Sequence, residues 1–124
     1  MSPLLLVMLG GALGSGGRYL TGRVTLDAFG PGFPFGTLAV NWIGCLLMGV
    51  LAGVLARTDA GEGWRLFLGV GILGGYTTFS AFSLDTILMI ERGQGALALG
   101  YVGLSLVGSL AALWAGLWFT RIFA

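Results

Sequence analysis

Residues 66–84 read LFLGVGILGGYTTFSAFSL, and this stretch decides the fold. It carries no charged residue, and it is close to the roughly 17–25 residues that a helix needs to cross a bilayer. Its centre holds two adjacent glycines and two adjacent threonines, which are poor helix formers. We therefore predict a membrane helix that breaks within residues 74–83. A broken helix at membrane depth persists only where its freed backbone groups are buried in protein or line water.

Three more uncharged runs cover residues 1–17, 28–56 and 93–120. Together with the central stretch they predict helices at about 3–20, 36–56, 66–90 and 96–120. The first run lacks a positive leading segment and a clear small-residue cleavage site, so we expect a retained helix and not a secretory signal. The expected fold is an all-α membrane protein with four transmembrane helices, the third broken mid-membrane, in one domain spanning residues 1–124.

Composition agrees with a membrane protein and excludes several functions. Of the 124 residues, 56% are hydrophobic and 9% are charged, against about 25% charged in soluble domains. The net charge is +1 without any basic cluster, so we expect no nucleic-acid partner. The sequence has no histidine, a single cysteine and no Gly-x-x-x-x-Gly-Lys motif for ATP. It therefore predicts neither an enzyme nor an energised pump.

The arginines are evenly divided between the two predicted sides of the membrane. One side would carry Arg57, Arg65 and Arg121, and the other Arg18, Arg23 and Arg92. Because the excess of positive charge orients a membrane protein, this balance predicts dual topology and an antiparallel homodimer. The alternative is that one arginine, such as Arg18, lies within a helix and does not count.

Glycines at i and i+4 offer helix-packing surfaces in three places. The pairs are Gly10 with Gly14, Gly49 with Gly53, and Gly71 with Gly75. Each pair could serve a dimer contact, although packing inside one subunit is the simpler interpretation for any single pair.

Polar side chains within the apolar runs are candidates for an ion pathway, because lipid disfavours them. Thr37 and Asn41 share a helix face, as do Tyr101, Ser105 and Ser109. The plainer alternatives are hydrogen bonds between helices for the first set and bonds to the serines' own helix for the second.

Two phenylalanines, Phe79 and Phe82, lie three residues apart just after the predicted break. The positive edge of an aromatic ring can face an anion without any nearby lysine or arginine. Ordinary packing is the alternative. Asp85 is the one carboxylate close by, and we place it in a watery mouth. Hydroxyl and amide donors suit a small, strongly hydrated anion, whereas a proton relay needs chains of acids or histidines.

Three motifs resemble those of the Fluc (CrcB-type) fluoride channels. They are residues 74–83 (GGYTTFSAFS), residues 36–44 (GTLAVNWIG) and residues 10–19 (GGALGSGGRY). They occur in the family's order, and the resemblance covers the whole chain. Position 81 is alanine where many members of the family have threonine.

The resemblance implies an antiparallel, dual-topology homodimer with two fluoride pathways and a structural sodium ion at the dimer centre. It places backbone carbonyls of Gly74 and Thr77 on sodium and Arg18 in a vestibule. The fluoride pathway that it implies is lined by Thr37, Asn41, Phe79, Ser80, Phe82, Tyr101, Ser105 and Ser109.

The expected function is therefore passive, fluoride-selective export from the cytoplasm, which would confer fluoride resistance. The expected location is the bacterial inner membrane, crossed several times. Two rival functions make different demands on the sequence. A small multidrug exporter needs a membrane carboxylate in the first helix, and residues 1–17 contain none. A scaffold subunit would transport nothing.

Overall fold

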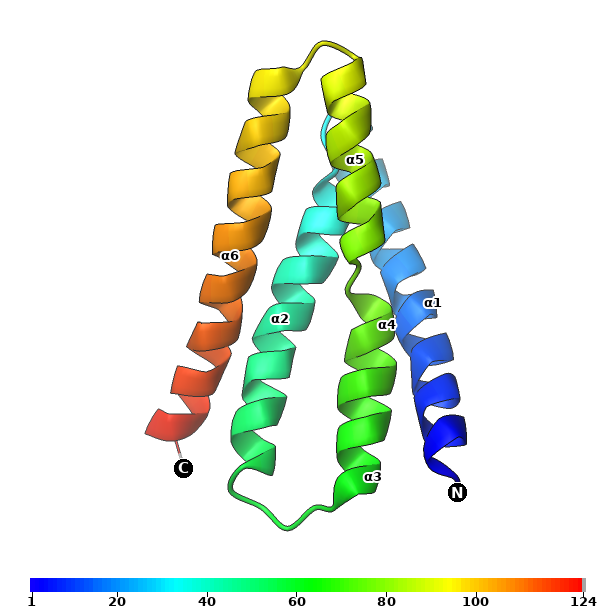
Figure 1. Cartoon of the computed structure of the whole chain (residues 1–124), viewed down its shortest axis with the longest axis vertical. Coiled ribbons are helices and arrows are strands. Elements are labelled where there is room, and N and C mark those ends of the chain that lie inside the picture. Colours follow the sequence, from blue (N-terminus) through cyan, green and yellow to red (C-terminus); the bar gives the residue numbers. More distant parts are fainter. Residues whose placement is uncertain (124) are drawn as a thin grey trace.

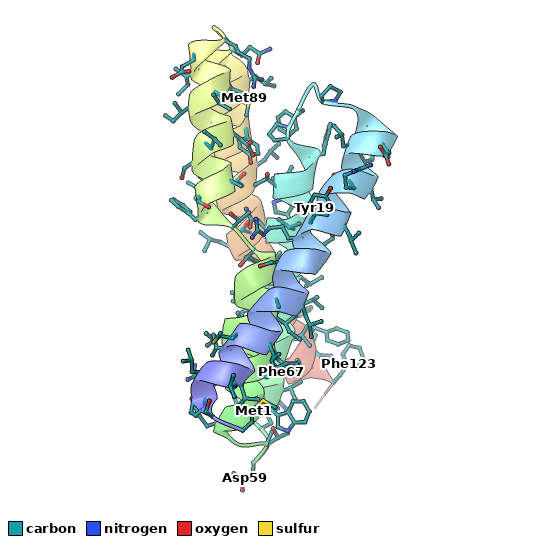
Figure 2. The ribbon with its side chains drawn as sticks, turned by 90° about the vertical axis from the view of Figure 1, so that its right-hand side faces the viewer. Met1, Tyr19, Asp59, Phe67, Met89 and Phe123 are labelled. Atoms are coloured by element: carbon teal, nitrogen blue, oxygen red, sulfur yellow. The ribbon has the colours of Figure 1, made fainter. Side chains whose placement is uncertain are left out.

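The computed structural model describes residues 1–123, and every element in this range is helical. The elements in chain order are α1 (Pro3–Phe29), α2 (Phe35–Leu55), α3 (Glu62–Trp64), the π-helix η1 (Arg65–Leu73), α4 (Gly74–Tyr76), α5 (Phe79–Glu91) and α6 (Gly95–Ile122). Figure 1 shows an elongated bundle with both termini at the end where α2 connects to α3. Figure 2 places Met89 near one end of the molecule and Asp59 at the other.

Helix α1 runs further than the sequence indicated. We expected it to end near residue 20, but it continues to Phe29 and includes Arg18, Arg23 and Asp27. The helix stops at Gly30, which has a φ of 76° that favours glycine and whose N–H bonds to the Leu26 carbonyl. Isolated charges do not end a helix, whereas a backbone that turns left-handed does.

Three segments are long and apolar enough to cross a membrane: Phe35–Leu55, Glu62–Glu91 and Gly95–Ile122. Helix α1 has 27 residues but is not among them. The charges in its second half lower its mean hydropathy. The fold is therefore that of a multi-pass membrane protein, and large apolar side chains such as Leu99, Val107 and Leu110 lie exposed on its outside.

The helical run Glu62–Glu91 is interrupted after Tyr76. Thr77 and Thr78 have extended backbones, with φ/ψ of −80°/157° and −153°/120°, and the helix resumes at Phe79. The segment before the interruption is the π-helix η1, in which the Gly74 N–H reaches back five residues to the Gly69 carbonyl. Figure 1 shows the gap between α4 and α5 as a stretch of coil between two helices.

Glycines let the helices touch backbone to backbone. A Cβ at Gly14 would lie 2.0 Å from the Ile72 carbonyl oxygen, and one at Gly75 would lie 2.7 Å from that of Gly11. On the other side of the bundle, a Cβ at Gly49 would lie 2.1 Å from the Leu113 carbonyl oxygen. All three glycine pairs found in the sequence thus pack α1 on η1 and α4, or α2 on α6, within the chain.

A cluster of buried side chains lies between α2, α5 and α6, on the far side of the break from the termini. It consists of Leu38, Phe82, Met89, Ala98 and Tyr101. This cluster fixes α5 against α6, so that the segment after the break belongs to a separate packing unit from α1, η1 and α4.

Candidate functional site

The break is held by the side chain of Asn41 on α2. Its Nδ2 donates to the Thr78 carbonyl at 3.0 Å, and its Oδ1 accepts from the Thr78 N–H at 2.8 Å. An amide offers one acceptor group and two N–H donors, so a single N–H of Asn41 stays free. The sequence indicated Asn41 as polar at membrane depth, but it did not reveal that this amide replaces the missing helix partners of Thr78.

Thr78 also begins the next helix. Its hydroxyl accepts from the Ala81 N–H at 3.1 Å, which caps the N-terminus of α5. The Ser80 hydroxyl lies 3.3 Å from the Thr78 hydroxyl and is exposed. From the sequence, Thr78 is notable only as a weak helix former, although threonine is among the residues preferred at a helix N-cap.

The first turn of α5 presents both phenylalanines of the motif. The rings of Phe79 and Phe82 have centroids 5.5 Å apart and planes at 56°. Their surroundings differ, because Phe82 is 8% exposed and Phe79 is 73% exposed. One ring packs in the core of the chain, while the other lies outside it.

Tyr101 lies at the centre of the aromatic cluster. Its side chain is fully buried, with its ring against Phe33 at 5.4 Å and Phe82 at 5.3 Å. Its hydroxyl donates to Asp85 Oδ2 at 3.1 Å. The single proton of Tyr101 is therefore engaged by a carboxylate from α5.

The two serines on the same face of α6 are placed differently. Ser105 is 5% exposed, and its Oγ is the one buried side-chain polar atom in residues 1–123 that has no hydrogen-bond partner. Ser109, one turn further on, is half-buried. A buried hydroxyl without a partner is uncommon and is available to a ligand.

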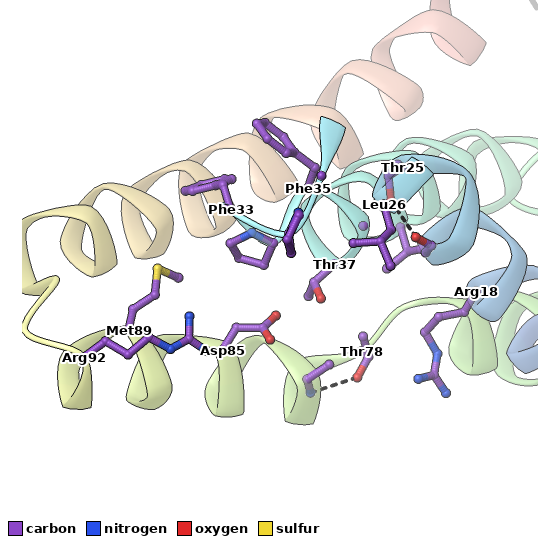
Figure 3. A pocket seen from close by; sticks show the side chains of 18 residues that line it. Arg18, Thr25, Leu26, Phe33, Phe35, Thr37, Thr78, Asp85, Met89 and Arg92 are labelled. Atoms are coloured by element: carbon purple, nitrogen blue, oxygen red, sulfur yellow. Dashed lines mark hydrogen bonds between the residues drawn. The ribbon is translucent and has the colours of Figure 1, made fainter. Parts of the chain in front are cut away.

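A cleft of about 370 Å³ opens beside the break, between α1, the loop that precedes α2, and α5. Figure 3 shows Thr37, Thr78 and Asp85 along it, with Arg18 at one end and Arg92 at the other. The cleft brings together residues from all three sequence motifs, which span residues 10–19, 36–44 and 74–83. Tyr101, Ser105 and Ser109 do not line it.

Arg18 lies within α1 and not in a connecting loop. Its Nε donates to the Gly75 carbonyl at 3.1 Å. This is the alternative that the sequence left open, in which Arg18 lies within a helix and does not count toward the orientation.

Within residues 1–123, the Thr77 carbonyl at the break has no hydrogen-bond donor. The Thr77 N–H and hydroxyl both bond to the Leu73 carbonyl, and the Thr78 N–H bonds to Asn41. The Gly74 carbonyl therefore loses the Thr78 N–H, which would be its partner in a continuous α-helix. Uncharged carbonyl oxygens at the end of a broken helix suit a hard cation.

Comparison with known proteins agrees with this set of features. The sequence model of the family described as CrcB-like protein, Camphor Resistance (CrcB), matches residues 5–117. The chain is 54% identical over 118 residues to the fluoride-specific ion channel FluC of Sphingopyxis alaskensis, covering 94% of both chains. It is 56% identical over 117 residues to the protein of that name from Cereibacter sphaeroides, covering 94% of this chain and 93% of the relative. It is 50% identical over 127 residues to that of Caulobacter vibrioides, covering 100% of both. The chain therefore belongs to the CrcB-like family.

Proposed function

We propose that this chain is the subunit of a fluoride-selective channel that releases fluoride passively from the cytoplasm through the bacterial inner membrane. Fluoride enters a cell as neutral HF in acid surroundings, ionises inside and can leave down its gradient, which would confer resistance. The observation that carries the proposal is 50–56% identity, over nearly the whole chain, to three proteins named as fluoride-specific ion channels.

The groups proposed for the pathway are uncharged donors and aromatic edges. The free N–H of Asn41 and the unpartnered hydroxyl of Ser105 can each replace a water molecule around the ion. The edges of Phe79 and Phe82 add a weak positive potential without a fixed charge. Ser80, Thr37, Tyr101 and Ser109 extend this polar track. Arg18 would serve the vestibule with its terminal nitrogens, since its Nε is engaged.

The proposed assembly is an antiparallel homodimer in which all four long helices cross the membrane and the break lies at mid-membrane. Phe79, whose ring is 73% exposed beside the break, is the residue of the motif that a second copy would cover. The three glycine pairs pack helices against each other within the chain, so the dimer would form through other faces. Without Arg18, which bonds at the level of the break, the remaining arginines number three (Arg57, Arg65 and Arg121) against two (Arg23 and Arg92), which is still close to the balance that dual topology needs.

A structural sodium ion at the dimer centre fits the residues present. The Gly74 and Thr77 carbonyls offer oxygen ligands, and two copies of the chain would double their number. A bound cation would compensate the negative end of the broken helix. The chain's own part is to hold the Gly74 and Thr77 carbonyls in place through the bonds to Leu73 and Asn41.

The direct test is fluoride efflux from proteoliposomes, followed with a fluoride electrode. Purified protein should release trapped fluoride when potassium and valinomycin relieve the charge imbalance, and it should release chloride far more slowly. Empty liposomes measure the leak of HF. Absence of fluoride efflux, or equal efflux of chloride, would refute the proposal.

A further inference from the structure

Helix α1 meets the end of α4 through two polar contacts made by side chains. Arg18 Nε donates to the Gly75 carbonyl at 3.1 Å, and the hydroxyls of Thr21 and Tyr76 lie 2.9 Å apart. Gly75 and Tyr76 are the last two residues of α4 before the break. We call these four residues the α1 latch.

The direction of the hydroxyl contact follows from counting protons. The Thr21 hydroxyl has one proton, and it is donated to the Gly17 carbonyl at 3.0 Å. The bond between Thr21 and Tyr76 therefore forms with Tyr76 as donor. Tyr76 holds α1 by its hydroxyl, and its phenol cannot donate elsewhere while this bond exists.

The ring of Tyr76 fits a slot made by two glycines on different helices. A Cβ at Gly17 of α1 would lie 3.4 Å from Tyr76 Cδ1, and a Cβ at Gly44 of α2 would lie 3.3 Å from Tyr76 Cδ2. The ring thus separates α1 from α2 at the level of the break. The two glycines fix the position of the ring, and the bond to Thr21 fixes the position of its hydroxyl.

Arg18 replaces a bond that the break removes. In a continuous helix the Gly75 carbonyl would accept from the N–H of residue 79, but the extended backbone at Thr77 and Thr78 prevents this. A guanidinium at the carboxyl end of a helix also compensates its partial negative charge. On the other side of the break, Asn41 takes the same role for Thr78.

We propose that Arg18 and Tyr76 are positioning residues, which fix the carbonyl end of the broken helix on α1 so that the anion pathway and the free carbonyls keep their geometry. This inference rests on the proposed channel function for its effect on flux, but not for its effect on the backbone. It assigns a role to Tyr76, and it gives Arg18 a second role beside that of a vestibule cation.

The test uses one conservative variant of each of the two residues, and two control variants on α1 that make the same chemical changes. Tyr76→Phe keeps the ring in its glycine slot and removes the hydroxyl, while Arg18→Lys keeps the charge and removes the Nε donor. The control variants are Tyr19→Phe and Arg23→Lys. Tyr19 and Arg23 form an exposed contact of 3.4 Å on α1, which does not touch the break.

Two measurements are made on the full-length protein in liposomes. Hydrogen exchange followed by mass spectrometry should show the amides of Thr77 and Thr78 exchanging about fivefold faster in Tyr76→Phe, the effect of losing one neutral hydrogen bond, and more than tenfold faster in Arg18→Lys. Fluoride efflux per folded channel should fall by at least about the same factors. Thr21→Val removes the hydroxyl that accepts from Tyr76. Because both changes break the same bond, the double variant with Tyr76→Phe should exchange and conduct much like either single variant.

The outcomes separate the latch from the channel. If the latch variants exchange and conduct like the control variants, the contacts are only packing and the inference is overturned. If the wild-type protein conducts no fluoride while the latch variants still exchange faster, the proposed function fails and the latch stands. A wild-type channel that conducts, with faster exchange and lower flux in both latch variants, supports both.

Discussion

Replacing Asn41 by leucine should destabilise the protein more than any other single change of similar size on α2. The side chain makes two hydrogen bonds to one peptide group, of 3.0 Å and 2.8 Å. Leucine has the same branched shape and the same number of side-chain heavy atoms, but it cannot form either bond. Each buried group left without a partner costs about 1–3 kcal/mol. Thr78 is only half-buried, so the lower part of that range applies to each group, which gives about 2–4 kcal/mol in total.

The assay is unfolding in mixed micelles titrated with SDS, with tryptophan fluorescence as the signal. Thr37→Val is the control, because Thr37 lies one turn earlier on the same face of α2 and forms no hydrogen bond to Thr78. A loss below about 0.5 kcal/mol for Asn41→Leu would refute the reasoning, since surface changes without a structural role have effects of that size.

An aspartate at this position tests the geometry of the two bonds. Asn41→Asp keeps an acceptor for the Thr78 N–H, but it places a second oxygen opposite the Thr78 carbonyl, where the amide now donates. Two acceptors facing each other repel, so this variant should be no more stable than Asn41→Leu. A stability close to that of the wild type would mean that only the contact with the Thr78 N–H matters.

Three further changes have clear expected results. Gly44→Ala would place a Cβ 2.2 Å from Thr77 Cγ2, so it should lower the yield of folded protein and fluoride flux, measured by size-exclusion chromatography and by efflux. Gly16→Ala meets nothing within 4 Å and should raise the stability of α1 by about 0.5–1 kcal/mol in the SDS titration, through helix propensity alone. Ser105→Ala should raise stability by about 1 kcal/mol, because it removes a buried hydroxyl without a partner, and it should lower fluoride flux in the electrode assay. A loss of stability for either of the last two variants would contradict the packing seen in the structure.

The features that the sequence predicted well are local ones. The two glycines and two threonines at 74–78 are weak helix formers wherever they occur, and the structure is extended at Thr77 and Thr78. The length of the apolar runs placed three of the four long helices within a few residues of their observed bounds. These properties depend on neighbouring residues and so can be read along the chain.

The features that the sequence did not predict depend on contacts between distant segments. Nothing along the chain shows that Asn41 bonds to a peptide 37 residues away, or that Arg18 bonds to one 57 residues away. The end of α1 at Phe29 is also not predicted, because Arg18 and Arg23 interrupt the apolar run while the helix itself continues to Gly30. Periodicity shows which face of a helix is polar, but it does not show which backbone group that face meets.

The hydrogen-bond donors of the proposed pathway differ in whether the fold already uses them, and this difference gives the unpartnered hydroxyl of Ser105 a role. Asn41 uses one N–H and its carbonyl to hold Thr78, and Tyr101 gives its only proton to Asp85. In the proposed pathway a fluoride ion would find the second N–H of Asn41 free, but it would compete with Asp85 for the proton of Tyr101. Ser105 is different, since its hydroxyl is buried and makes no such bond. A partner hydroxyl or carbonyl inside the chain would remove the cost of burying this donor, but it would also remove the donor that can replace water around the ion. The missing hydrogen bond of Ser105 lowers the stability of the fold, and a dehydrated anion that accepted from this hydroxyl would recover that stability. This is the energetic pattern expected of a binding position.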